Sequence, residues 1–207
     1  MRLTSLLVIL AAALVAGQSD LDPDSHARLP YLQRKDMSEA DQKIFDALPG
    51  RGKDDVLRGP LAFAAYNPGA AKALFDLHNA AVAGSLTPRV RELAIMVACR
   101  ETNYGLEWNG HRATAIKVGV DEKLLDVILD NRDLTGVSDA DAAVIRFGRQ
   151  LYRDKKVDSA TFAKVVELFG RKGAMDVVAV MNTYAVSGFY AIAVDEHMAR
   201  MLSPLCE

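Results

Sequence analysis

The sequence predicts an all-α protein, a single-domain helical bundle of seven or eight helices, on three observations. Segments rich in Ala, Leu and Val, each preceded by a capping residue, favour helix along most of the chain. No well-bounded run alternates β-branched and aromatic residues with polar ones, so strand signals are weak. Half of the 207 residues are hydrophobic and a quarter are charged, as is typical of globular proteins.

Residues 1–19 have the pattern of a secretory signal peptide. Arg2 supplies a short basic region, and the run LTSLLVILAAALVA that follows carries no charge. Val15 and Gly17 fit the −3 and −1 positions of a cleavage site. A membrane anchor is the alternative, but the run is short for a span of about 20 residues. We therefore expect export to the periplasm or the extracellular space.

The chain after the signal peptide divides into an arm and a helical domain. Residues 20–37 are polar and contain proline, so we expect an extended N-terminal arm ahead of a domain over residues 38–207. Ser38 opens the first helix, which runs to about Leu48, and Asp41 is the acidic partner of its cap. The glycine- and proline-rich residues 49–60 form a loop.

The next two helices begin with the same signal, a capping residue followed by proline at the first helical position. Asn67 starts a helix over residues 68–82, and Thr87 starts one over residues 88–103. Gly105 then breaks or bends the chain. Caps and glycine stops predict the remaining helices over residues 106–118, 121–129, 139–152, 159–169 and 174–201.

The last predicted helix is the longest and is apolar around nearly its whole circumference. Such a helix is buried on all sides, by its own domain or by a partner subunit. Its length would permit a membrane span, but Asn182, Thr183, Ser187 and Gly188 interrupt it. We therefore expect burial with oligomerisation and no stable membrane insertion.

Charge and cysteine content exclude several classes of function. The 25 Lys and Arg against 27 Asp and Glu give no basic excess, so no nucleic-acid partner is expected. The two cysteines, Cys99 and Cys206, form neither a C-x-x-C motif nor a zinc framework. We expect Cys99 to be a buried small hydrophobe and Cys206 to lie exposed on the C-terminal tail. Whether they pair is left open, because the sequence does not establish their proximity.

The most informative stretch is YGLEWNGH, residues 104–111. Glu107 and His111 are four apart, so a helix places them on one face, and Tyr104 precedes Glu107 by three. Upstream, Glu92 and Cys99 are seven apart and share a face of their own helix. Glu92 lies among apolar residues, where a half-buried carboxylate needs a hydrogen-bond donor or a proton.

Each of these features also has a purely structural interpretation. A Glu–His pair four apart on an exposed helix stabilises it by only roughly 0.2–0.5 kcal/mol. Glu92 near a helix N-terminus can simply complement the helix dipole. Trp108 is of a type that usually lies in a core or an interface. Spacing alone therefore does not establish an active site.

A resemblance to a known family favours the functional interpretation. Residues 86–120, LTPRVRELAIMVACRETNYGLEWNGHRATAIKVGV, resemble the core motif of the carboxymuconolactone decarboxylase family, which includes alkyl hydroperoxidase D. The motif elements are P-R-x-R-E-L-A-I and E-W-x-x-H, the latter being Glu107, Trp108 and His111. Residues 58–74 and 141–178 also resemble members of the family. The resemblance implies an alkyl hydroperoxidase D-like bundle that assembles into a homo-oligomer, a trimer or a hexamer.

The peroxidase branch of that family has the pattern E-x11-C-x2-C-x3-H. In this chain Glu92 and His111 match its Glu and His, but Tyr104 and Glu107 stand at its two cysteine positions. Without C-x-x-C there is no thiolate to attack a peroxide and no second thiol to close a disulfide. The chain therefore resembles a branch of the family without dithiol chemistry.

Proton chemistry is the activity that the resemblance then implies. Loss of CO2 from a carboxylated lactone leaves an enolate-like carbanion, which a tuned His or Glu can protonate. We expect a cofactor-independent and metal-free enzyme acting on a small lactone or keto acid. His111 is the expected general acid or base, Glu107 its orienting or relay partner, and Glu92 a second proton carrier. The residues expected at the substrate are Tyr104, Trp108 and Cys99.

Two alternatives stay open at this point. One is a hydroperoxide reductase that uses Cys99 alone, because Cys99 lies on the Glu92 face. The other is a non-catalytic oligomeric binding protein that keeps the fold. The sequence also does not identify which cation would hold a substrate carboxylate, and the candidates are Arg89, Arg91, Arg100 and Arg112.

Overall fold

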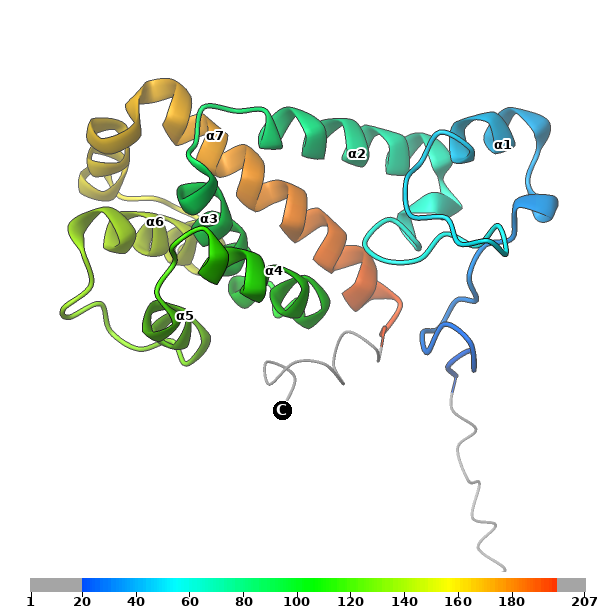
Figure 1. Cartoon of the computed structure of the whole chain (residues 1–207), viewed down its shortest axis with the longest axis horizontal. Coiled ribbons are helices and arrows are strands. Elements are labelled where there is room, and N and C mark those ends of the chain that lie inside the picture. Colours follow the sequence, from blue (N-terminus) through cyan, green and yellow to red (C-terminus); the bar gives the residue numbers. More distant parts are fainter. Residues whose placement is uncertain (1–19, 197–207) are drawn as a thin grey trace, which may run out of the picture.

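The structure is a computed structural model that describes residues 20–196. The predicted signal peptide and the tail with Cys206 therefore lie outside the described residues. Residues 20–196 form seven α-helices and, apart from two isolated bridges, no β-strand (Figure 1). The helices are α1 (Glu39–Phe45), α2 (Pro68–Val82), α3 (Pro88–Glu101), α4 (Gly105–Lys117), α5 (Glu122–Leu129), α6 (Asp139–Arg149) and α7 (Ser159–Ala193). The predicted all-α class is confirmed.

The helix starts follow the capping signals of the sequence. At six N-termini a capping side chain accepts a hydrogen bond from a backbone N–H of the first turn, which stabilises the helix start. These residues are Ser38, Asn67, Thr87, Asp121, Ser138 and Asp158. In α2 and α3 proline follows the cap at the start of the helix, as predicted.

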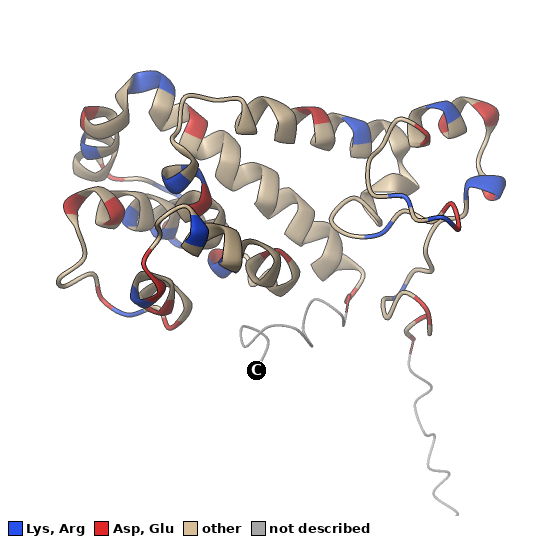
Figure 2. Ribbon diagram, viewed as in Figure 1, with Lys and Arg blue, Asp and Glu red and all other residues tan. Residues whose placement is uncertain are grey.

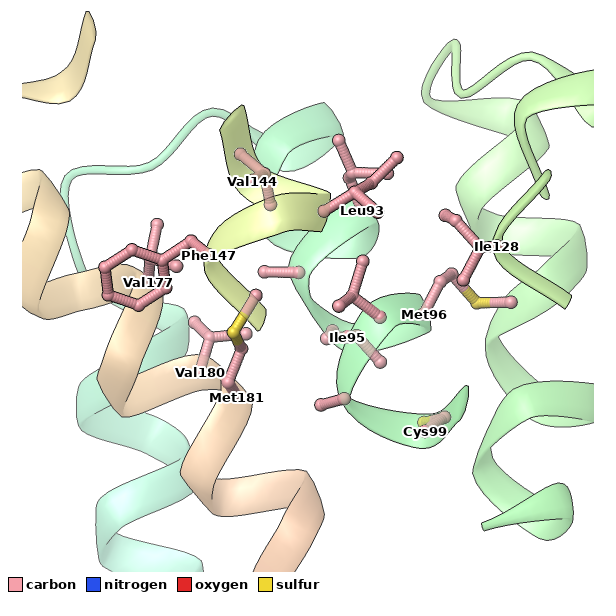
Figure 3. Close-up of a cluster of buried hydrophobic side chains, with 14 of the residues drawn as sticks. Leu93, Ile95, Met96, Cys99, Ile128, Val144, Phe147, Val177, Val180 and Met181 are labelled. Atoms are coloured by element: carbon pink, nitrogen blue, oxygen red, sulfur yellow. The ribbon is translucent and has the colours of Figure 1, made fainter. Parts of the chain in front are cut away.

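Helix α3 lies at the centre of the larger core. It contacts α4, α5, α6 and α7, and its residues Glu92–Cys99 are all buried (Figure 1). The buried side chains of α3 interleave with those of α5, α6 and α7, as Figure 3 shows for Met96, Ile128, Phe147 and Met181. Because neighbours cover α3 on every side, the one carboxylate in this run, that of Glu92, is enclosed as well.

A second, smaller core lies under α1 and the first half of α2. It is built from Phe45, Leu57, Leu61, Ala71 and Leu74, among others. Short one-turn 3-10 helices, η1 (Arg34–Asp36) and η2 (Ala64–Tyr66), flank this part of the chain. Helix α2 contacts both α1 and α7, so it connects the smaller core to the larger one.

The connection between α3 and α4 is a tight Schellman turn. Asn103 adopts a left-handed conformation with φ 54°. The N–H groups of Asn103 and Tyr104 donate to the carbonyls of Arg100 and Cys99, which closes the end of α3. The sequence predicts a break at Gly105, but this residue is the first of α4. The break lies at Asn103, which also tolerates positive φ.

Helix α7 differs from the two helices predicted for this region. The helices predicted over residues 159–169 and 174–201 form one element, α7, which is kinked at Gly170 (φ 71°), close to the predicted stop. This helix ends at Ala193, well before the expected end near residue 201, because Asp195 takes a left-handed conformation and closes a second Schellman turn. In the same way, the predicted helix to Tyr152 ends at Arg149 and continues as a π-helical turn, η3 (Gln150–Asp154).

No charged residue occurs in α7 between Val177 and Ala193, which Figure 2 shows as an uninterrupted tan stretch. Among the described residues, α7 is the one helix long and apolar enough to cross a membrane. Half of its most apolar window is buried inside the protein, and Phe189 and Ile192 are among its exposed side chains.

Residues 20–37 pack against two separate parts of the chain. The backbone N–H of Arg28 donates to the Val194 carbonyl at 2.7 Å, and Ala27 is fully buried. The hydroxyl of Tyr66 donates to the Pro30 carbonyl, also at 2.7 Å. This arm therefore ties the end of α7 to the smaller core. Whether it is a unit separate from residues 38–207 stays a prediction.

Candidate active site

Two carboxyl groups hold the imidazole of His111, one at each ring nitrogen. Nδ1 lies 2.8 Å from Oε2 of Glu92, and Nε2 lies 3.2 Å from Oε2 of Glu107. The side chains become more buried along this chain of contacts. His111 is 24% exposed, Glu107 12% and Glu92 6%, so Glu92 is the innermost member.

The fold produces this arrangement through the α3–α4 hairpin. The Schellman turn at Asn103 directs α4 back along α3, so that His111 reaches Glu92 on the preceding helix. Glu107 lies one turn before His111 on α4, as the four-residue spacing predicts. The expected need of Glu92 for a hydrogen-bond donor is thus met by His111 Nδ1.

The environment of His111 favours its charged form. Burial is the largest single influence and lowers its pKa, but the hydrogen bonds and charges of Glu107 and Glu92 together outweigh it. The pKa of His111 rises from 6.5 to about 9. At neutral pH the ring is therefore an imidazolium that presents an N–H to each carboxyl group.

Tyr184 on α7 packs against the same imidazole. The two rings meet edge to face, with centroids 5.0 Å apart and an angle of 89° between their planes. The ring of His78, on α2, approaches Tyr184 at 6.0 Å and 61°. Tyr184 thereby stands between two histidines from different helices. Burial raises the pKa of its phenol well above the ordinary value, so the hydroxyl stays protonated.

A cavity of about 270 Å³ opens onto this group between α2, α4, α7 and the loop of residues 49–61. Its apolar wall consists of Pro49, Pro60, Leu61, Leu74 and Phe75. Its polar wall consists of His78, Glu107, His111, Thr183, Tyr184 and Ser187. The volume suits a small molecule, and the lining combines apolar side chains with a few polar ones.

Three of the six predicted site residues come together here. Glu107 and His111 line the cavity, and Glu92 lies directly behind His111. Tyr104, Trp108 and Cys99, which were expected at the substrate, are not among the residues that line this cavity. All three are buried in the protein core, at 1%, 2% and 0% exposure.

Helical geometry explains why these three residues do not line the cavity. Tyr104 is the N-cap of α4 and not part of its helical face, and its ring packs against α7 at Gly188 and Ala191. Trp108 follows Glu107 by one residue and points about 100° away from it around the helix. Cys99 shares the face of Glu92 but lies about two turns further along α3.

Cys99 also lacks the properties of a reactive thiol. It is a free cysteine with no exposed surface. Burial, and then the charges of Glu107 and Glu92, raise its thiol pKa well above the ordinary value. Reactive cysteines have lowered pKa values and solvent access. The structure therefore disfavours the alternative of a hydroperoxide reductase that uses Cys99 alone.

The four arginines considered for holding a carboxylate are all engaged away from the cavity. Arg89 forms a bidentate pair with Asp141, and Arg112 pairs with Glu122. Arg91 and Arg100 donate to the backbone carbonyls of Val82 and Leu129. In the described part of the chain, the lining of this cavity contains neither Lys nor Arg.

Sequence reasoning missed His78 and the α7 side of the cavity. The signal for Thr183, Tyr184 and Ser187 is present in the sequence, because polar residues one turn apart interrupt an otherwise apolar helix. These interruptions argue against membrane insertion, and the same residues also line the cavity. His78 carries no local signal, since a single histidine on an amphipathic helix is ordinary.

Among residues 20–196, no group of three or more His, Cys, Asp or Glu side chains is arranged to hold a metal ion. Each ring nitrogen of His111 already faces a carboxyl oxygen. A histidine held between two carboxyl groups is an arrangement that can donate and accept protons.

Comparison with known proteins gives two results. The sequence model described as "Carboxymuconolactone decarboxylase family" matches residues 68–150. Among solved structures, the chain is similar to a cysteine-to-alanine variant of the debrominase Bmp8 in complex with 2,3,4-tribromopyrrole. That similarity has a TM-score of 0.59 at 14% identity and covers 80% of this chain and 88% of the other. No curated protein sequence matches the chain.

Proposed function

We propose that this protein, whose residues 68–150 match the model of the carboxymuconolactone decarboxylase family, is a cofactor-independent acid–base enzyme. It transfers a proton on a small, uncharged carbonyl compound such as a lactone. The single observation that carries this proposal is the contact between His111 and the buried Glu92. That contact holds a charged imidazole at the wall of a small cavity.

The three side chains have separate roles in this proposal. His111 is the general acid, since it is charged at neutral pH and lines the cavity. Glu92 accepts from Nδ1, which fixes the ring orientation and keeps the second proton in place. Glu107 shares the Nε2 proton at the cavity wall, where it orients this proton and relays it toward the substrate.

The proton step balances without any further reagent. The enolate-like form of the substrate takes the Nε2 proton of His111, and its electron pair forms the new C–H or O–H bond. The imidazole is left neutral and still bonded to Glu92. It then regains a proton from water.

The substrate class follows from the charges around the cavity. Two carboxyl groups already neutralise the imidazolium, and no Lys or Arg lines the cavity in the described part of the chain. A substrate carboxylate would lose its hydration and meet Glu107 without a compensating cation, which is unfavourable. We therefore favour neutral lactones and ketones over keto acids and carboxylated lactones.

Hydrogen–deuterium exchange tests this function before the natural substrate is known. A panel of neutral five- and six-membered lactones and small cyclic ketones is incubated with the full protein in D2O. NMR then follows deuterium entry at the carbon next to the carbonyl. Carboxylated members of the same series form the comparison set. We expect catalysed exchange with neutral members and little with charged ones.

The decisive variant is His111→Asn, because the Asn amide still donates toward Glu92 but cannot carry the proton. The matched control is His26→Asn, on the exposed N-terminal arm. Loss of exchange by His111→Asn alone supports the proposal. Wild-type exchange in His111→Asn overturns it. Lactone binding without any exchange favours the non-catalytic binding protein instead.

A further inference from the structure

The proposed function supplies a proton donor but leaves the proton acceptor unassigned. Formation of an enol from a neutral carbonyl compound needs one group that donates to the oxygen and another that removes the proton from the carbon. His78 is the other imidazole that lines the cavity. We propose that His78 is the proton acceptor of this site and acts on the same substrate as His111, an inference that rests on the proposed function.

The geometry sets the two histidines apart on one cavity wall. His78 comes from α2 and His111 from α4, and the ring of Tyr184 packs against both, at 6.0 Å and 5.0 Å between centroids. Both imidazoles therefore contact the same phenol ring. A small ring in the cavity can then face one histidine with one atom and the other histidine with another.

The two rings differ in what binds their nitrogens. Both nitrogens of His111 are held by carboxyl groups. Within the described part of the chain, His78 has no side-chain hydrogen bond to its ring. A neutral imidazole whose nitrogen has no protein donor keeps a lone pair to accept a proton.

Electrostatics gives the rings opposite protonation states. Burial lowers the pKa of His78, whereas the carboxyl groups raise the pKa of His111 to about 9. At pH 7 to 8 His78 is therefore neutral and His111 is charged. A pair of groups whose surroundings separate their pKa values in this way is the usual arrangement of a general base and a general acid.

Three other charged groups act on His78, and their effects partly cancel. Glu107 raises the pKa of His78, whereas the positive charges of His111 and Arg91 lower it. Since burial is the largest influence, the neutral form does not depend on any one of these neighbours. The partial exposure of His78 also lets the proton that it has accepted exchange with solvent.

The combined step is a tautomerisation. His78 takes a proton from the carbon next to the carbonyl, and the C–H electron pair becomes the C=C bond of the enol. The carbonyl oxygen takes the Nε2 proton of His111. In the reverse step the carbon takes a proton back from His78 and the enol O–H proton returns to His111, which restores the carbonyl compound and both histidines. In D2O the proton on His78 exchanges with solvent before it returns, so the carbon gains deuterium. No electron is gained or lost, so no oxidant or reductant is required.

The first test is the same exchange assay with His78→Asn, His26→Asn and Glu107→Gln. Removal of a general base costs about 10²- to 10⁴-fold. We therefore expect His78→Asn to lower the exchange rate by at least about 100-fold, while lactone shifts in NMR titrations still report binding. Wild-type exchange in His78→Asn, with exchange lost in Glu107→Gln, would assign the acceptor to Glu107 and overturn our inference.

Chemical rescue separates a proton acceptor from a structural residue. In His78→Ala, added imidazole should restore exchange in proportion to its neutral form. Substituted imidazoles of different pKa should restore it to different extents at one pH. If the restored exchange rate does not depend on the pKa of the added base, or if a folded variant shows no rescue, His78 is not the acceptor.

NMR titration of the His78 ring checks the electrostatic part independently. In His111→Asn the pKa of His78 should rise, because a neighbouring positive charge is gone; in Glu107→Gln it should fall.

The exchange assay distinguishes the proposed function from the role proposed for His78. Loss of exchange in His111→Asn but not in His78→Asn leaves the proposed function standing and removes only this inference.

Discussion

The raised pKa of His111 predicts a specific dependence of stability on pH. The pKa of the ring rises from 6.5 to about 9 on folding. A tenfold change in proton affinity corresponds to about 1.36 kcal/mol, so the charged ring stabilises the native state by about 3 kcal/mol. Solvent screening reduces this stabilisation only slightly, because the His111 side chain is 24% exposed and those of Glu107 and Glu92 are 12% and 6% exposed.

The sign of the effect follows from which state holds the proton more tightly. Below pH 6.5 the ring is charged in both the folded and the unfolded chain, and the full contribution is present. Between pH 6.5 and about 9 the unfolded chain loses its proton first, so the free energy of unfolding falls as the pH rises. Above about 9 the contribution is gone.

Denaturant unfolding of wild type and His111→Asn, from pH 6 to pH 9.5, measures this contribution. Because other groups also titrate in this window, the quantity of interest is the difference in unfolding free energy between the two proteins. We expect this difference to be larger at pH 6 than at pH 9.5 by about 3 kcal/mol. Protein concentration is held constant, because association would change the apparent stability.

NMR titration of the His111 ring should give a midpoint near 9. A wild-type minus His111→Asn difference that is the same at pH 6 and pH 9.5 would refute the assignment of an imidazolium between two carboxyl groups. A His111 midpoint near 6.5 would refute it directly.

Four further predictions concern the rest of the chain. Gly148→Ala should lower the unfolding free energy by about 1–3 kcal/mol in denaturant melts, because its Cβ would overlap the side chain of Val97 in the core. Cys99→Ser should consume peroxide in the presence of dithiothreitol no more slowly than wild type, because the thiol is buried. Phe189→Ser should shift light-scattering mass toward the monomer, since this exposed ring lies on the charge-free half of α7. Expression with the native leader should give exported protein with an N-terminus near residue 18, as mass spectrometry can establish.

The helices were predictable from the sequence because their starts are encoded locally. A capping side chain and a proline at the first turn act within four residues, whatever the rest of the chain does. The ends were less predictable. Asn103 and Asp195 end α3 and α7 in left-handed conformations that the sequence favours only weakly. The expected break at Gly105 and the expected helix end near residue 201 were wrong for this reason.

The same distinction applies to the candidate site. Glu107 and His111 share a helix, so their spacing predicted their contact correctly. Glu92 and His111 lie on consecutive helices, and the motif E-x11-Y-x2-E-x3-H indicated their relation through family resemblance. Tyr104 was misplaced because a position in a motif does not reveal that a residue is a helix cap. Its ring therefore packs on α7 and not toward the cavity.

About half of the residues that line the cavity lie outside the segment that matches the family model. The family match covers residues 68–150, which include the Glu92, Glu107 and His111 group. The lining residues outside it are Pro49, Pro60 and Leu61, before α2, and Thr183, Tyr184 and Ser187, on α7. Helices α2 and α7 pack against each other. The segment that matches the family model therefore holds the groups of the proposed proton chemistry, whereas about half of the cavity lining can change without altering that segment. We expect substitutions in this lining to change substrate preference and to leave the contacts of His111 with Glu92 and Glu107 intact.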